Sequence, residues 1–462
     1  MKHIWFVVYF VVFSSVLVGS VWAVRSADKD PALTHTLNVA LGNSDDAQRS
    51  LLWIAKRGLP DLAPHLINAL RYTRLNAAEI NMTLQAITGE TTAKDWFHWM
   101  LWQQRHGDLV PHHSFLAYKS TVFQSIDKNF ARFINPNINF DIRIEDIVWG
   151  GVHVDGIPAL DSPKFIKADD ADYLLDDDEV FGVEINGDAR AYPLRIMGWH
   201  EMFNDVIGGV PVSLAYCTLC GAAILYEGEH EGRIALGIKE PFTFGSSGLL
   251  YQSNKLMYDR QSESLWNQFT GEPVSGALRG SGLTLKIRPV VITSWGKWKA
   301  QHHDTKVLSP KTGFNRDYGS GVVYKDYFAS QDLMFPALGD QQGRLDNKTQ
   351  IFGLRLTGGI KAWPLEAFGG GRILNDRVGA INVVLIGEAD TRTVRAYERG
   401  AYEFDAGLKS QDGQIWTVRE DTLINKVGDI TLKRLPGHVA YWFAWAGYMG
   451  EKSVLFETAG NP

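Results

Sequence analysis

The chain has 462 residues, of which 45% are hydrophobic and 21% charged, and its formal net charge is −6. This length favours two or three domains rather than a single core. The negative charge and the lack of any block of Lys or Arg argue against a basic surface for nucleic acid, so no nucleic-acid partner is expected.

Residues 1–24 read as a targeting segment. Two polar residues after the initial Met are followed by an uncharged apolar run, and Val-Trp-Ala at positions 21–23 fits the cleavage site of a secretory signal peptide. The run is about 20 residues long, which is also long enough for a membrane anchor. Both alternatives predict an exported, periplasmic or otherwise extracytoplasmic chain, with membrane contact possible through this segment. Its cysteines would then face an oxidising compartment.

Residues 45–130 are predicted to be helical. Apolar residues recur there at three- and four-residue steps, the spacing of amphipathic helices. Gly58-Leu59-Pro60 and Arg74-Leu75-Asn76 are predicted to break the pattern, and residues 96–102 form an aromatic-rich last helix. Short antiparallel helices of this kind resemble HEAT-type repeats, so the segment is a candidate surface for a protein partner.

Four histidines lie in or just after this helical segment. They are His98, His106, His112 and His113, and none has an acidic or cysteine partner at a metal-ligand spacing. They are therefore predicted to be surface or loop residues.

The character of the chain changes after Pro136. Short runs that are apolar or alternating end in turn residues, which is typical of strands. The predicted fold class is therefore α+β and multi-domain, with a signal or anchor and a small HEAT-like helical segment preceding a β-rich part.

The β-rich part contains an internal repeat. Phe181-Gly182 recurs as Phe352-Gly353, Ala191-Tyr192-Pro193-Leu194 recurs as Ala362-Trp363-Pro364-Leu365, and Asn204-Asp205 recurs as Asn375-Asp376. We therefore expect two pseudo-symmetric copies of one β-rich unit, at 145–330 and 345–460, the second one degenerate.

The two copies differ where chemistry is expected. Cys217 and Cys220, the only cysteines of the chain, lie in a segment that the second copy lacks, and Gly371-Arg372 stands where the first copy has His200-Glu201. The thiols, the imidazole and the carboxylate thus occur together in the first copy only. This comparison predicts one elaborated site in the first copy.

Three interpretations of that site remain open. His200, Cys217 and Cys220 would bind a transition metal, Zn or Cu, with a fourth position left for water or substrate. Alternatively, Cys217 and Cys220 form a redox-active pair. Glu201 would be a fourth metal ligand, an outer partner or a proton carrier, or else a surface residue beside a helix start. The third interpretation, from a different class, is a non-catalytic binding or scaffolding module with a structural Cys217–Cys220 disulfide.

Two further patterns are weaker. Zinc deaminases combine His-x-Glu with Pro-Cys-x-x-Cys, but His200 and Glu201 are adjacent and Tyr216 replaces the proline. Gly245-Ser246-Ser247-Gly248 is predicted to be a turn whose N–H groups and hydroxyls would hold an anion.

Several motifs together resemble one bacterial and archaeal family, the domain of unknown function 3179. They include the sequences at 187–194, 200–205, 216–221 (Tyr-Cys-Thr-Leu-Cys-Gly), 247–250, 257–260, 264–266 and 307–309. The resemblance is close over roughly 147–327, although the family usually has proline at the position of Thr218. It implies an exported or membrane-anchored protein, and it brings no catalytic residue or cofactor with it. Whether the chain is an enzyme is left open.

Overall fold

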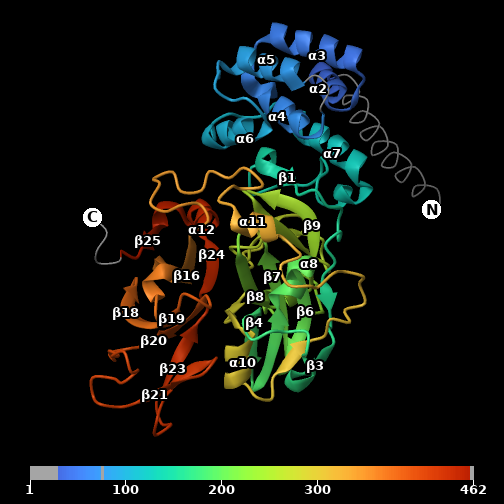
Figure 1. Cartoon of the computed structure of the whole chain (residues 1–462). Coiled ribbons are helices and arrows are strands. Elements are labelled where there is room, and N and C mark those ends of the chain that lie inside the picture. Colours follow the sequence, from blue (N-terminus) through green and yellow to red (C-terminus); the bar gives the residue numbers. More distant parts are fainter. Residues whose placement is uncertain (1–29, 74–76, 458–462) are drawn as a thin grey trace, which may run out of the picture. The chain divides into compact units, whose positions relative to one another are not determined.

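The computed structural model describes residues 30–73 and 77–457, which fall into two compact units (Figure 1). The first comprises residues up to 137 together with 144–146, and the second comprises 138–143 and everything from 147 onward. The predicted signal or anchor at 1–24 and the predicted break at Arg74-Leu75-Asn76 lie outside the described residues. Within the described ranges, no helix combines the length and the apolar character needed to span a bilayer.

The first unit is helical, as its apolar periodicity predicts. Its helices are α2 (Pro31–Leu41), α3 (Ser44–Arg57), α4 (Ala63–Tyr72), α5 (Ala77–Thr88), α6 (Trp96–Arg105) and α7 (Phe115–Ile126). The Asn43 side chain caps α3, which ends at Gly58 in the left-handed conformation, so the first predicted helix break is confirmed. Ile54, Leu66 and Leu84 are fully buried in this unit. The HEAT-type assignment remains a prediction.

The second unit begins with three five-stranded sheets. Their strand orders are β1-β9-β10-β11-β12, β13-β8-β7-β6-β2 and β14-β4-β5-β15-β3. The strands are β1 (Ile147–Trp149), β2 (Leu160–Asp161), β3 (Phe165–Lys167), β4 (Glu179–Ile185), β5 (Asp188–Pro193), β6 (Met202–Ile207), β7 (Val210–Cys217), β8 (Ala222–Glu227), β9 (Phe244–Tyr251), β10 (Asn254–Asp259), β11 (Leu265–Asn267), β12 (Pro273–Ser275), β13 (Ile287–Arg288), β14 (Val291–Ser294) and β15 (Lys306–Leu308). Between them lie α8 (Leu194–His200), α9 (Gly232–Ala235) and α10 (Trp295–Gln301), and α11 (Lys325–Ala329) follows.

Two more sheets complete this unit, with the orders β24-β16-β17-β25 and β18-β19-β20-β23-β22-β21. The strands are β16 (Gln350–Leu356), β17 (Gly359–Pro364), β18 (Arg372–Val378), β19 (Ile381–Glu388), β20 (Thr393–Glu398), β21 (Trp416–Val418), β22 (Thr422–Asn425), β23 (Thr431–Leu435), β24 (His438–Tyr441) and β25 (Ser453–Leu455), and α12 spans Trp442–Met449. Helices followed by a β-rich region give an α+β fold, as expected.

One sheet from each half of this unit has the same strand arrangement. In the first, β14, β4 and β5 are antiparallel neighbours and β15 adds in parallel to β5. In the second, β24, β16 and β17 are antiparallel neighbours and β25 adds in parallel to β17. Each central strand carries a glycine, Gly182 or Gly353, against the ring of a buried tryptophan, Trp298 or Trp445.

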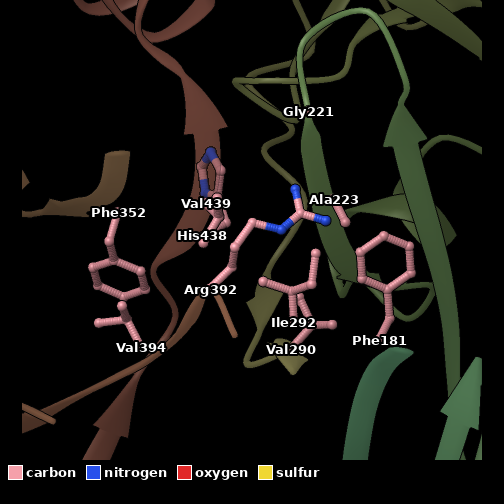
Figure 2. A pocket seen from close by; sticks show the side chains of 10 residues that line it. All are labelled: Phe181, Gly221, Ala223, Val290, Ile292, Phe352, Arg392, Val394, His438 and Val439. Atoms are coloured by element: carbon pink, nitrogen blue, oxygen red, sulfur yellow. The ribbon is translucent and has the colours of Figure 1, made fainter. Parts of the chain in front are cut away.

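The two halves of the β-rich unit share a hydrophobic core. Phe181 and Leu214 from the first half belong to the same buried cluster as Phe352 and Leu385 from the second. Figure 2 shows a narrow pocket at this junction, with the Arg392 side chain extending from the second half toward Ala223 and Ile292 of the first. The halves therefore pack as one body.

The predicted turn at Gly245-Ser246-Ser247-Gly248 is wrong. These residues lie inside β9, whose register against β10 shifts between Leu256 and Met257. Only Gly248 has a positive φ, of 75°. The four residues resemble a turn because small polar residues favour turns. In the structure Gly245 and Ser246 pair with Tyr258 and Met257 of β10, and Ser247 and Gly248 form the bulge at the register shift.

Candidate functional site

Cys217 and Cys220 flank a tight turn between two central strands. Cys217 is the last residue of β7, and Cys220 precedes β8 by one glycine. Gly221 has a φ of 60°, and a Cβ atom there would lie 3.1 Å from the ring of Tyr441, so the turn needs glycine both for its backbone and for space. Both cysteines are buried. The turn is thereby held in one conformation by the strands on either side and by the second half of the unit.

The two sulfur atoms lie 2.8 Å apart, and both cysteines are free thiols. The predicted structural disulfide is therefore not formed in this structure. The Cys220 sulfur also accepts a hydrogen bond from Asn254 Nδ2 at 3.1 Å and lies 3.4 Å from the Ser253 carbonyl oxygen. Burial, followed by the neighbouring Cys217, raises the pKa of Cys220 well above its ordinary value, so this thiol stays protonated at neutral pH.

Glu201 lies next to this turn. It follows the last residue of α8 with a φ of 55°, and its N–H bonds Met197 O while its carbonyl accepts from Tyr216 N, both at 2.7 Å. A left-handed backbone is unfavourable for glutamate and persists where the surroundings over-determine it, often at functional sites. The predicted proximity of Glu201 to the cysteines is thus produced by the β6–β7 pairing that follows α8.

The Glu201 carboxylate is fully engaged. Its Oε1 accepts a hydrogen bond of 2.8 Å from the Thr218 hydroxyl, and its Oε2 forms an ion pair with Lys255 Nζ. The side chains of Glu201 and Lys255 are only 6% and 5% exposed. Ion pairs this deeply buried rarely add net stability, because both charges lose their hydration. Removal of either partner would nevertheless leave an uncompensated buried charge.

A small cavity of about 50 Å³, partly open to solvent, lies over these residues. Cys217, Thr218, Glu201 and Lys255 form its polar part, whereas Cys220 does not line it. The remaining lining is mostly apolar and includes Val152, Ile157, Leu219, Leu249, Leu250, Met334 and Phe335. A cavity of this size holds a few water molecules and is much smaller than an ordinary ligand pocket of roughly 300–1,000 Å³.

Tyr324 closes one side of this pocket. Its φ is 58°, which makes it a second non-glycine residue with a left-handed backbone at the same pocket. Burial and then the negative charge of Glu201 raise the pKa of Tyr324 to about 12, so its hydroxyl remains protonated and can donate a hydrogen bond.

The structure places His200 in a different environment from the sulfurs. Its Nδ1 donates to the Pro158 carbonyl at 2.8 Å, and its Nε2 accepts from the Tyr318 hydroxyl at 2.6 Å. Burial lowers its pKa, which keeps the ring neutral in this arrangement. With both nitrogens engaged, His200 connects the end of α8 to two loops.

The predicted metal set of His200, Cys217 and Cys220 is therefore not brought together. In the described ranges, the only group of three or more His, Cys, Asp or Glu residues with ligand atoms mutually within 4.8 Å contains none of these residues. His200 and Glu201 are adjacent in sequence, but the left-handed turn at Glu201 sends their side chains to different partners. That divergence is a tertiary effect which no spacing rule predicts.

Sequence reasoning missed Lys255, Asn254 and Tyr324. Lys255 and Asn254 follow a hairpin turn at Gln252-Ser253, where both residues have positive φ. This turn brings β10 back toward the cysteines, and a lone lysine at the start of a strand carries no sequence signal. Tyr324 belongs to a long loop before α11, whose position depends wholly on packing.

A family model matches the part of the chain that carries the motifs described above. The model of the family described as "Protein of unknown function (DUF3179)" matches residues 154–452, which is more than half of the chain. The chain belongs to this family, and the resemblance drawn from the motifs is confirmed. No match is found among curated proteins or among solved structures.

Proposed function

We propose that the protein is a thiol–disulfide oxidoreductase of the cell exterior, with Cys217 and Cys220 as its redox pair. The observation that carries this proposal is the asymmetry of the two thiols. Their sulfurs are 2.8 Å apart, yet Cys217 lines the pocket and Cys220 lies behind it. One sulfur is therefore placed to meet a substrate and the other to resolve the product.

The proposed reaction is thiol–disulfide exchange. The Cys217 thiolate attacks one sulfur of a substrate disulfide, which forms a mixed disulfide and releases the first substrate thiol. The Cys220 thiol then gives its proton to the departing substrate thiolate, and its sulfur attacks Cys217 Sγ. This step forms the Cys217–Cys220 disulfide and releases the second substrate thiol. The substrate gains two electrons and the protein loses two, and the reverse sequence oxidises a dithiol substrate.

The cysteine turn would be positioned by its contacts with Glu201, Thr218 and Lys255. The charges of Glu201 and Lys255 would set the electrostatic environment of the thiols. The Glu201 carboxylate opposes formation of a Cys220 thiolate, since its charge raises the pKa of that thiol. Lys255 offsets that charge through its ion pair with Glu201. The lining is mostly apolar, and a substrate disulfide would reach Cys217 only when the lining side chains move aside, because the cavity holds only a few waters.

Two other functions remain as alternatives. A Zn or Cu site at the cysteines would need ligands other than His200, whose nitrogens are both engaged. A non-catalytic binding module with a structural disulfide would give Cys217 no reason to face a pocket. The redox interpretation accounts for the free thiols, the pocket and the buried ion pair together.

The test is a redox titration of the purified full-length chain in glutathione buffers, with thiols counted by alkylation and mass spectrometry. We expect one disulfide per chain to form and reopen reversibly, as a two-electron process, at a potential above about −300 mV, the range of labile disulfides. With an aromatic disulfide as the probe, Cys220→Ser should trap a stable mixed disulfide at Cys217. Cys217→Ser should be unreactive.

Three results would overturn the proposal. The first is a pair that never forms a disulfide, and the second is one that stays oxidised far below about −300 mV, which would indicate a structural staple. The third is stoichiometric metal in elemental analysis of the wild type that disappears in Cys217→Ser. In that last case His200→Ala would decide whether the histidine contributes.

We also propose that the β-rich unit arose by duplication of one smaller unit. Matching hydrogen bonds support it: Tyr192 Oη and Trp363 Nε1 each donate to the aspartate 13 residues later, Asp205 or Asp376, at 2.6 and 2.7 Å. The Asn204 side-chain amide donates to the Phe244 carbonyl and accepts from the Phe244 N–H. Asn375 makes the same two hydrogen bonds with the backbone of Phe404. The second copy then acts as a scaffold, and its Tyr441 N–H holds the Cys220 carbonyl at 2.8 Å.

Export through residues 1–24 completes the proposal. An extracytoplasmic compartment is where labile disulfides form and are exchanged. In this arrangement the helical unit offers a surface for a protein partner. Fractionation of cells that express the tagged chain, with protease accessibility as the readout, tests the location independently of the redox activity.

A further inference from the structure

The helical unit contains a cluster of two histidines and one aspartate. A ligand atom from each of Asp30, His112 and His113 lies within 4.8 Å of the others. His112 and His113 were expected to be surface or loop residues because no acidic partner stands near them in the sequence. The fold supplies that partner from 82 positions away (112 − 30), since Asp30 precedes α2 and the histidines precede α7.

We propose that Asp30, His112 and His113 form a binding site for a divalent transition metal, with Zn²⁺ as the reference ion. Two imidazoles and one carboxylate are borderline ligands of the kind that Zn²⁺ accepts. Three protein ligands leave at least one position for water. This site is separate from the cysteine pocket and does not depend on the proposed redox function.

The contacts of each residue support this assignment. The two carboxylate oxygens of Asp30 have different partners. Oδ1 accepts a hydrogen bond of 2.9 Å from Ala32 N and caps α2, whereas Oδ2 lies 3.1 Å from His113 Nε2. The second oxygen therefore points away from the helix toward the imidazoles. The cap fixes the carboxylate before any metal arrives, which reduces the ordering that binding requires.

His112 is oriented by groups behind it. The Ser114 hydroxyl contacts His112 Nδ1 at 2.8 Å and the buried His65 Nε2 at 3.2 Å. The Ser114 backbone N–H also donates to His112 Nδ1 at 3.3 Å, so Ser114 engages this nitrogen with both its backbone and its side chain. The His112 and His113 ring centroids lie 4.1 Å apart with an interplanar angle of 37°, so the two consecutive residues place their imidazoles close together.

The site is open to solvent. The His113 side chain is 80% exposed and that of Asp30 is 17% exposed. A metal can therefore enter without local unfolding. When bound, it would join the start of α2 to the segment before α7, and since it binds only the folded arrangement it would stabilise the helical unit.

The test uses the full chain with Cys217→Ser and Cys220→Ser, so that thiols cannot compete for the ion. Zn²⁺ binding is measured by competition with a chromophoric chelator, and Co²⁺ is added as a spectroscopic probe of coordination. We expect one ion per chain at micromolar concentration, and at least tenfold weaker binding in His113→Ala and in Asp30→Asn. Asparagine also caps helices well, so Asp30→Asn keeps the start of α2.

His98→Ala is the matched control, because His98 is another exposed histidine paired with an aspartate, Asp95. It should leave the affinity unchanged. Added Zn²⁺ should also raise the unfolding temperature of the cysteine-free chain but not that of its His113→Ala variant. The absence of binding, or binding that His113→Ala and Asp30→Asn leave unchanged, would reduce the cluster to an ordinary ion pair and overturn the proposal.

Discussion

The hydroxyl of Thr218 donates a hydrogen bond of 2.8 Å to Glu201 Oε1. Thr218 stands between the two cysteines, so this bond attaches the cysteine turn directly to the buried Glu201–Lys255 ion pair. A change in the charge or position of the Glu201 carboxylate should therefore change the position of the cysteine turn and the pKa of its thiols.

Thr218→Val should remove this hydrogen bond while keeping the shape of the side chain. Thr218 is 1% exposed, so Glu201 Oε1 would lose its partner without gaining water. Hydrogen bonds to charged groups contribute about 1.5–3 kcal/mol, and we expect a loss of unfolding free energy in that range. Urea unfolding measures it. Thr121→Val, on the exposed face of α7, is the control and should change the stability by less than about 0.5 kcal/mol.

Lys255→Met and Glu201→Gln should each destabilise the protein by about 3–5 kcal/mol, because each leaves one partner of a buried ion pair uncompensated. The double variant should lose less than the sum of the two. A double-mutant cycle from urea unfolding provides the coupling energy. Strict additivity would mean that the two charges do not interact.

Glu201→Gln should also lower the pKa of Cys220. The negative charge of Glu201 is one of the groups that raise this pKa, although burial and Cys217 contribute more. The ultraviolet absorbance of the thiolate as a function of pH gives the shift. Glu229→Gln, which neutralises a carboxylate that is 44% exposed, serves as the control. An unchanged Cys220 titration in Glu201→Gln would show that the carboxylate does not influence the thiols.

His438→Gln should reduce the acid sensitivity of the protein. Burial, with a smaller contribution from Arg355, lowers the pKa of His438 from 6.5 to about 3. Between these values the unfolded chain binds a proton that the folded chain refuses, so stability falls by about 1.4 kcal/mol for each pH unit below 6.5. The variant should lose this slope in urea unfolding between pH 6.5 and 4. His303→Gln, at an exposed position, should retain it.

Gly182→Ala and Gly353→Ala should destabilise the β-rich unit to a similar extent. A Cβ atom would lie 2.3 Å from the Trp298 ring in the first case and 2.1 Å from the Trp445 ring in the second. Overpacking of this kind costs about 1–3 kcal/mol, sometimes more. Gly447→Ala, where the nearest atom would be 3.7 Å away, is the control. A large loss at only one of the two glycines would argue against equivalent copies.

Several features followed from the sequence alone. The helical unit was predictable because a packed helix needs apolar residues at three- and four-residue steps, and the strands because a half-buried strand alternates. Phe181-Gly182 and Phe352-Gly353 lie in matching segments, so two related copies could be predicted from the residues, but their strand order could not. The family followed from motifs that stand in a fixed order. Cys217 and Cys220 could be singled out because no other cysteines exist.

Tertiary structure alone decided what surrounds these residues. His200 and Glu201 are neighbours in the chain, but the left-handed backbone at Glu201 turns one side chain toward Tyr318 and the other toward Thr218. Lys255 reaches the site through a hairpin, and Asp30 meets His112 and His113 through helix packing. Local sequence sets the periodicity of an element, whereas contacts between distant elements depend on how buried surfaces fit together. Residue type and spacing do not encode that fit.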